Sequence, residues 1–187
     1  MSNRSAAPKP TTYVALLRGI NVGGKNVLPM KALAETFGAV GCSRVRTYVQ
    51  SGNVVFDSSE PRPGLAASLS RHIADRHGLQ VPVVLRTAQE LAAIARGCPF
   101  ADPGGEKPAL HVVFLADVPT AKAAASLDPA RSPPDRFVLV GREIYLFCPN
   151  GLGTSKLTNA YFDAKLATVS TARNMRTVAA LVELSQR

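Results

Sequence analysis

The sequence predicts an α+β protein built from two ferredoxin-like halves, each with the order β-α-β-β-α-β and an antiparallel sheet, followed by a C-terminal helix. Two observations carry this prediction: short apolar or alternating runs are interspersed with amphipathic stretches, and the same order occurs on both sides of a Pro- and Gly-rich segment at 98–108. The repeat lies in the order of elements rather than in matching residues. We therefore expect a lead-in over 1–10, a first half over 11–97, a linker over 98–108 and a second half over 109–187.

In the first half, apolar or alternating runs indicate strands at 13–18, 44–49, 53–57 and 81–86. Pro29 suits the first position of a helix, since its missing N–H group is not needed there. Apolar residues at helical spacing predict a second helix that ends near Gly78 and a third over 88–96. Ser51-Gly52 is a tight-turn pair, so the second and third strands should form a hairpin.

In the second half, the same criteria indicate strands at 110–116, 137–140, 144–148 and 168–170 and helices at 120–127, 156–166 and 173–186. Thr120 is expected to cap the first of these helices. Gly141-Arg142 is the expected turn of a hairpin. A glycine-bearing loop over 149–155 leads to the next helix, which would place Lys156 in its first turn.

Composition limits the possible classes of function. The chain has 187 residues, of which 46% are hydrophobic and 19% charged, as expected for a folded protein with a sizeable core. No apolar run approaches the ~18 residues of a membrane helix, so we expect a cytoplasmic protein without a membrane partner. The cysteines Cys42, Cys98 and Cys148 are too widely spaced for a disulfide framework or a metal pair, so no metal site is expected, and the sequence names no cofactor.

The net charge of +9 favours polyanionic partners. The cations are spread along the chain, however, and seven Phe, four Tyr and no Trp offer few stacking surfaces for bases. Nucleic acid is therefore a possible partner with weak support.

Polar segments that a core does not need lie at 18–26, 50–53, 149–159 and 171–174. In a β-α-β-β-α-β unit, the loop after the first strand and the turn between the second and third strands lie at one end of the sheet. The exits of the third and fourth strands lie together at the other end. The residues expected to bind a ligand are Arg18, Asn21, Gly23, Gly24, Lys25, Asn26, Gln50, Ser51 and Asn53 in the first half, and Asn150, Gly151, Gly153, Ser155, Lys156, Asn159, Arg173 and Asn174 in the second.

Glycine-bearing loops with a lysine, such as these, are typical of anion binding. Glycine lets successive N–H groups point into one concavity, and the lysine adds positive charge. The leading hypothesis is therefore a phosphate-bearing small ligand, such as a nucleotide. Lys25 and Lys156 would supply charge, Arg173 would act as a second clamp, and the asparagines would orient polar groups. In the alternative interpretation, the glycines only form tight turns and the asparagines only cap helices.

Three other functions have partial support in the sequence. Residues 19–25 match the first seven positions of the P-loop pattern, but Asn26 stands where Ser or Thr would ligate magnesium, and Pro29 starts the helix too late. An RNA-recognition sheet needs paired aromatic residues, whereas 53–56 supplies one. An enzyme would need an acid or base near the loops, for which Asp163 and Tyr161 are the nearest candidates.

The longest of these motifs resemble a known family. The segments at 13–26 (YVALLRGINVGGKN), 47–56 (TYVQSGNVVF), 145–151 (YLFCPNG), 155–159 (SKLTN) and 171–177 (TARNMRT) are similar to the bacterial domain of unknown function (DUF) family 1697 over about residues 12–184. The chain departs from the family where Met175 replaces a usual tryptophan. The resemblance implies a cytoplasmic two-part α+β protein and supplies no activity, substrate or catalytic residue.

Overall fold

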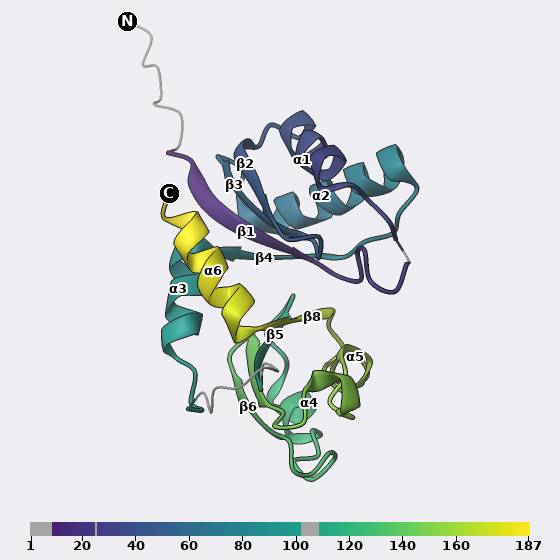
Figure 1. Cartoon of the computed structure of the whole chain (residues 1–187), viewed down its shortest axis with the longest axis vertical. Coiled ribbons are helices and arrows are strands. Elements are labelled where there is room, and N and C mark those ends of the chain that lie inside the picture. Colours follow the sequence, from purple (N-terminus) through teal and green to yellow (C-terminus); the bar gives the residue numbers. More distant parts are fainter. Residues whose placement is uncertain (1–8, 25, 102–108) are drawn as a thin grey trace, which may run out of the picture. The chain divides into compact units, whose positions relative to one another are not determined.

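A computed structural model describes residues 9–24, 26–101 and 109–187 of the chain (Figure 1). The chain divides into two compact units, Met1–Ala88 and Gln89–Arg187. The division leaves nearly all of helix α3 (Ala88–Arg96) in the second unit, whereas the sequence analysis drew the boundary after residue 97. Within the described residues, no helix is long and apolar enough to cross a membrane.

The first unit has the predicted β-α-β-β-α-β order. Its elements are β1 (Thr11–Leu17), α1 (Met30–Ala39), β2 (Ser43–Tyr48), β3 (Asn53–Ser58), α2 (Arg62–His77) and β4 (Val83–Thr87). The strands form an antiparallel sheet in the order β2-β3-β1-β4, so β3 separates β1 from β2 as predicted. Pro29 directly precedes α1, and Gly78 ends α2 in the left-handed conformation.

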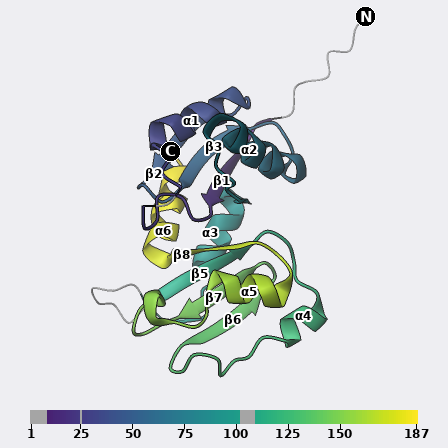
Figure 2. The same ribbon diagram turned by 90° about the vertical axis from the view of Figure 1, so that its right-hand side faces the viewer.

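The core of the first unit lies between this sheet and its two helices (Figure 2). Because side chains alternate along a strand, Tyr13, Ala15 and Leu17 of β1 point to the same face. They pack with buried residues of both helices, among them Phe37 of α1 and Leu69 of α2. The helices thus bury the alternating apolar face that predicted the strands.

The second unit repeats the topology and adds helices at both ends. After α3 its elements are β5 (Leu110–Leu115), α4 (Ala121–Ala125), β6 (Arg136–Val140), β7 (Glu143–Phe147), the short 3-10 helix η1 (Leu152–Thr154), α5 (Asn159–Leu166), β8 (Ser170–Asn174) and α6 (Met175–Ser185). The antiparallel sheet has the order β6-β7-β5-β8, which confirms the second ferredoxin-like half and the C-terminal helix. Thr120 caps α4 as predicted, since its side chain accepts a hydrogen bond from the amide of Ala123.

Several boundaries in the second unit differ from the prediction, and two of them bear on the candidate site. Helix α5 begins at Asn159 rather than at Lys156, because Thr158 is the residue whose hydroxyl caps it, 3.2 Å from the amide of Tyr161. The last strand covers Ser170–Asn174 rather than 168–170. The segment at 171–174, which was expected to be a polar loop, is therefore part of the sheet and pairs with β5.

Helices cover both faces of the second sheet. On one face, Val113 of β5 and Ile144 of β7 pack with Phe162 and Leu166 of α5. On the other face, the Tyr145 hydroxyl donates to the carbonyl of Ile94 in α3 at 3.0 Å, and α6 contacts β5 and β8.

The turn after β2 depends on Gly52. Its φ is +70°, and a Cβ atom there would lie 2.3 Å from Cγ2 of Ile20 and 2.8 Å from Cβ of Leu17. We expect Gly52→Ala to lower the free energy of unfolding by about 2–5 kcal/mol, since strain in the left-handed region adds to overpacking.

Gly78→Ala is the matched control, because Gly78 has φ +68° and no atom within 4 Å of the added Cβ. It should cost only the backbone strain of about 1–2 kcal/mol. Denaturant unfolding of both variants measures the difference, and equal losses would show that the close approach to Ile20 is unimportant.

Candidate functional site

The two polar loops of the first unit lie side by side, as the sheet topology predicted. The Asn21 side chain donates to the carbonyl of Gln50 at 2.8 Å, and the Leu17 amide donates to the carbonyl of Gly52 at 2.8 Å. We call residues 19–28 together with 50–53 the first loop cluster. Lys25, which was expected to share a concavity with Gln50, lies outside the described residues.

The asparagines of the first loop cluster bind backbone. The Asn21 amide group also accepts from the Leu28 amide and donates to the Leu28 carbonyl, at 2.8 and 2.9 Å. Asn26 donates to the carbonyl of Gly19, and buried Asn53 donates to the carbonyl of Tyr48 and to the Ser51 hydroxyl. These side chains close the loop and the hairpin, so their contacts have a structural explanation.

In the second unit, the exits of β7 and β8 share one end of the sheet, because both strands run antiparallel to β5. Two of the predicted site residues there bind backbone. Asn174 caps α6 by accepting from the Thr177 amide at 2.8 Å, and the Ser155 hydroxyl accepts from the Leu157 amide at 3.0 Å. Gly151 has a φ of +84° just before η1, and Gly153 lies within that helix.

Lys156 is not in the first turn of a helix, which corrects the sequence interpretation. It precedes the N-cap residue of α5 by two positions and is exposed. Its amide donates to the Ser132 hydroxyl at 3.0 Å, and its carbonyl accepts from Nε of Arg131 at 3.2 Å. Lys156 therefore belongs to the loop before α5 and not to the helix.

Arg173, which was expected to clamp a ligand together with Lys156, lies in strand β8. Arg173 and Ala172 are adjacent in β8, so their side chains point to opposite faces. The Arg173 guanidinium donates to the Thr171 hydroxyl and to the Ala172 carbonyl, both at 2.8 Å. Burial lowers the pKa of Arg173 to about 10, so the group stays charged at neutral pH.

A cavity of about 220 Å³ lies at the start of α5. Its lining residues are Leu152, Leu157, Thr158, Asn159 and Ala172. We call this cavity the α5 pocket. Asn159 was among the predicted site residues. The apolar lining was not predicted, because Leu152 and Leu157 are spaced like core residues and Ala172 was expected in a loop.

Asn159 has the most unusual environment in the α5 pocket. Its side-chain oxygen Oδ1 is buried, and no described residue donates a hydrogen bond to it. The amides of Tyr161 and Phe162 both bond to Thr158, through its hydroxyl and its carbonyl. Thr158 does not bond to the first-turn amides of Asn159 and Ala160. The positive end of the helix dipole lies at these two residues.

The candidate groups for catalysis are engaged elsewhere or inert. Asp163 accepts from the Ser170 hydroxyl at 2.6 Å, and the Tyr161 hydroxyl accepts from the Asp128 amide at 2.8 Å. Burial raises the pKa of Cys42 and of Cys148 to about 11, which keeps both thiols protonated. Within the described ranges, no group of three or more His, Cys, Asp or Glu residues could hold a metal ion.

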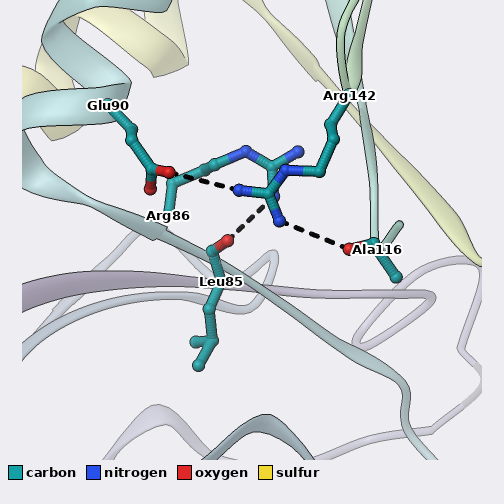
Figure 3. Close-up of polar contacts among 5 residues, drawn as sticks. All are labelled: Leu85, Arg86, Glu90, Ala116 and Arg142. Atoms are coloured by element: carbon teal, nitrogen blue, oxygen red, sulfur yellow. Dashed lines mark hydrogen bonds and ion pairs between the residues drawn. The ribbon is translucent and has the colours of Figure 1, made fainter. Parts of the chain in front are cut away.

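A second cavity, of about 370 Å³, was not predicted from the sequence. It is lined by Glu90, Ala93, Ile94, Val118, Gly141, Arg142 and Glu143. Arg142 donates to Oε1 of Glu90 at 3.2 Å and to the carbonyl of Ala116 at 3.4 Å (Figure 3). The sequence indicated only a hairpin turn at Gly141-Arg142, because the partners of Arg142 are distant in the chain.

The fold defines a two-unit α+β protein, and the second unit has a cavity of about 220 Å³ at the start of α5. A model of the family described as "Protein of unknown function (DUF1697)" matches residues 11–145, and the chain belongs to this family. The match ends within β7, so the α5 pocket lies beyond it.

The chain is also similar to a solved structure, that of the conserved bacterial protein SP0830 from Streptococcus pneumoniae. The two share 20% sequence identity with a TM-score of 0.72, over 96% of this chain and 100% of that chain. This similarity supports the fold. Comparison with curated proteins gives no significant match.

The contacts of Asn21 predict a structural role that can be measured. Asn21 and Asn26 both have left-handed φ angles, of 54° and 48°, so glycine suits both positions. Asn21→Gly removes three hydrogen bonds and should lower the free energy of unfolding by about 2–3 kcal/mol, whereas Asn26→Gly removes one and should cost about 1 kcal/mol or less. If Asn21→Gly keeps full stability in denaturant unfolding and instead abolishes anion binding, the first loop cluster is a ligand site.

His111 predicts a pH dependence of stability. It is buried in β5, and burial lowers its pKa below the ordinary value of 6.5, with only partial compensation by the carbonyl of Ala109. The unfolded chain therefore binds a proton that the folded chain does not, so stability is lost as the pH falls through 6.5. We expect the decrease in melting temperature from pH 7.5 to pH 5.5 to be smaller in His111→Phe than in the wild type. Identical decreases would contradict this role.

Proposed function

We propose that this protein binds a small phosphate-bearing ligand in the α5 pocket. The observation that carries the proposal is the pocket's position at the start of an α-helix. Backbone N–H groups and the helix dipole favour an anion at such a place. Thr158 and Asn159, the N-cap residue and the first residue of α5, both line the cavity.

Charge and shape support the same ligand. Lys156 is exposed two residues before Thr158, and the chain has a net charge of +9, so an anion is attracted to the protein as a whole. Leu152, Leu157 and Ala172 give the pocket an apolar wall. This wall suits the carbon skeleton of a ligand whose charged group lies at the helix.

The size of the pocket narrows the ligand class. An apolar cavity of about 150 Å³ holds a benzene ring, and pockets for drug-sized ligands have about 300–1,000 Å³. A cavity of about 220 Å³ therefore suits a phosphate on a short carbon skeleton better than a whole nucleotide. The cytoplasmic location expected from the sequence stays part of this proposal.

Filling the pocket tests the proposal. Ala172→Leu places a larger side chain on the face that lines the cavity, so it should leave the free protein as stable as the wild type or more so and should abolish binding. At a phosphate concentration ten times Kd, the wild type should gain about 1.4 kcal/mol, which raises the melting temperature by about 3–6 °C. The variant should show no such shift.

Two lysine variants separate local from general charge effects. Lys156→Ala should weaken the phosphate-induced shift, whereas Lys122→Ala removes an equally exposed charge from α4 and should leave the shift unchanged. The same shift in the wild type and in Ala172→Leu would place the anion elsewhere, and the absence of any shift in the wild type would refute anion binding. A shift that disappears steeply with added salt in every variant would instead indicate a diffuse polyanion surface.

A further inference from the structure

We propose that two copies of this chain associate through strand β6, whose free edge pairs antiparallel with β6 of a second copy around a two-fold axis at Val138. The sheets of the two second units would then form one continuous sheet. This inference is independent of the proposed function, because the two places lie on opposite faces. Val138 pairs with Tyr145, which bonds to α3, whereas Leu157 and Ala172 of the α5 pocket pack on the other face of the sheet.

The outer edge of β6 is open. β6 is an end strand of its sheet and pairs with β7. In a two-residue hairpin, the pair next to the turn, here Val140 and Glu143, exchanges both hydrogen bonds. Phe137 and Leu139 therefore direct their amides and carbonyls away from β7. Among the described residues, none outside β7 is hydrogen-bonded to the backbone of residues 136–140, and a row of such groups is a template for another strand.

The corresponding end strand of the first unit is protected against such pairing. β2 contains Arg44 and Arg46, and its pairing with β3 has a register irregularity. Charged side chains and bulges are the means by which edge strands avoid association. β6 has a regular register and an uncharged sequence over 137–140, with Val138 and Val140 exposed by 36% and 53%. An open and apolar edge of this kind favours a partner strand.

The hydrogen-bonding pattern of β6 is self-complementary. With the two-fold axis at Val138, Phe137 pairs with Leu139 of the partner subunit, and Leu139 pairs with Phe137 of the partner subunit. These are the two residues whose amides and carbonyls point to the free edge, so the outward groups of both strands match. The two Val138 side chains meet on the axis and bury each other.

Charge complementarity favours a second copy as the occupant. In the same register, Arg136 lies opposite Val140 of the partner subunit, and Glu143 of the partner subunit follows in the next strand of that row. Neighbouring strands are about 4.8 Å apart, so about 10 Å separates the Cα atoms of arginine and glutamate, which their long side chains can bridge on one face. The axis forms this ion pair twice.

Arg136 is available for that ion pair. It is exposed, and no described Asp or Glu residue forms a salt bridge with it. Its guanidinium lies over the ring of Phe147, 4.8 Å from the centroid. Turning toward the free edge exchanges this contact for a carboxylate of the partner subunit.

A lysine on the axis tests the interface. Val138→Lys places two like charges directly opposite each other, so it should raise the dimer dissociation constant about a hundredfold. Val169→Lys is the matched control, because Val169 is also exposed by 36% but lies before β8. Sedimentation equilibrium from about 1 to 100 μM protein should show the wild type and the control approaching twice the 19.8 kDa mass of the chain, and Val138→Lys remaining at that mass.

A charge exchange tests the register. Arg136→Glu and Glu143→Arg should each weaken the dimer about tenfold, and the double variant should restore it, because the opposite charges then face each other in reverse. This measurement also decides the matter if Val138→Lys does not fold.

The other outcomes overturn the proposal. A wild type that stays monomeric over the whole range excludes the dimer and leaves the β6 edge to a different kind of partner. A dimer that Val138→Lys weakens no more than Val169→Lys does lies on another surface. A double charge variant that stays as weak as the single variants contradicts the two-fold register at Val138.

Discussion

Each unit depends on a first strand that is hydrogen-bonded on both edges. β1 lies between β3 and β4, and β5 lies between β7 and β8, all antiparallel. This pairing forces the two neighbours of the central strand to run parallel to each other, so their exits meet at one end of the sheet. It also brings the loop after the first strand to the hairpin between the second and third. In the first unit the approach is close enough that only glycine fits at position 52, against Ile20 and Leu17.

The same topology has different consequences in the two units. In the first loop cluster, the side chains of Asn21 and Asn26 bond to backbone groups of the loop after β1. In the second unit, the loop after β7 is tightened by η1, and Ser155 satisfies the amide of Leu157. Asn159 is then not needed for loop closure, and its side chain lines a cavity instead. Polar side chains such as Asn21 in the first unit and Ser155 and Asn174 in the second therefore hold backbone, whereas Asn159 lines a cavity.

The sequence predicts the order of elements well, because apolar spacing and turn residues are local signals. The limits of α3, the hairpin at Gly141 and the cap at Thr120 follow from such signals. The start of α5 could not be predicted from local signals, because Ser155 and Thr158 are both residues that commonly cap a helix. Which of them caps α5 depends on the amide of Lys156, which bonds to Ser132, a residue distant in the chain. The extent of β8 also escapes prediction, because Thr171 and Arg173 look like loop residues until β5 supplies partners. The α5 pocket is lined by residues at the start of α5 and by Ala172 of β8, two segments whose bounds the sequence did not predict. The sequence therefore indicated Asn159 as a site residue but did not indicate the cavity that it lines.

The energetics of the pocket connect binding to the stability of the second unit. A cavity lined by leucine and alanine lacks the dispersion contacts that a filled core would have, and the unpartnered oxygen of Asn159 adds a desolvation penalty. A ligand that fills the cavity would gain dispersion contacts with the leucine and alanine side chains of its wall. Such a ligand binds the folded state and not the unfolded chain, so its binding free energy appears as added stability. The first loop cluster has its asparagines already bonded, and a ligand there would have to replace hydrogen bonds that exist. We therefore assign the proposed ligand to the α5 pocket of the second unit rather than to the first loop cluster.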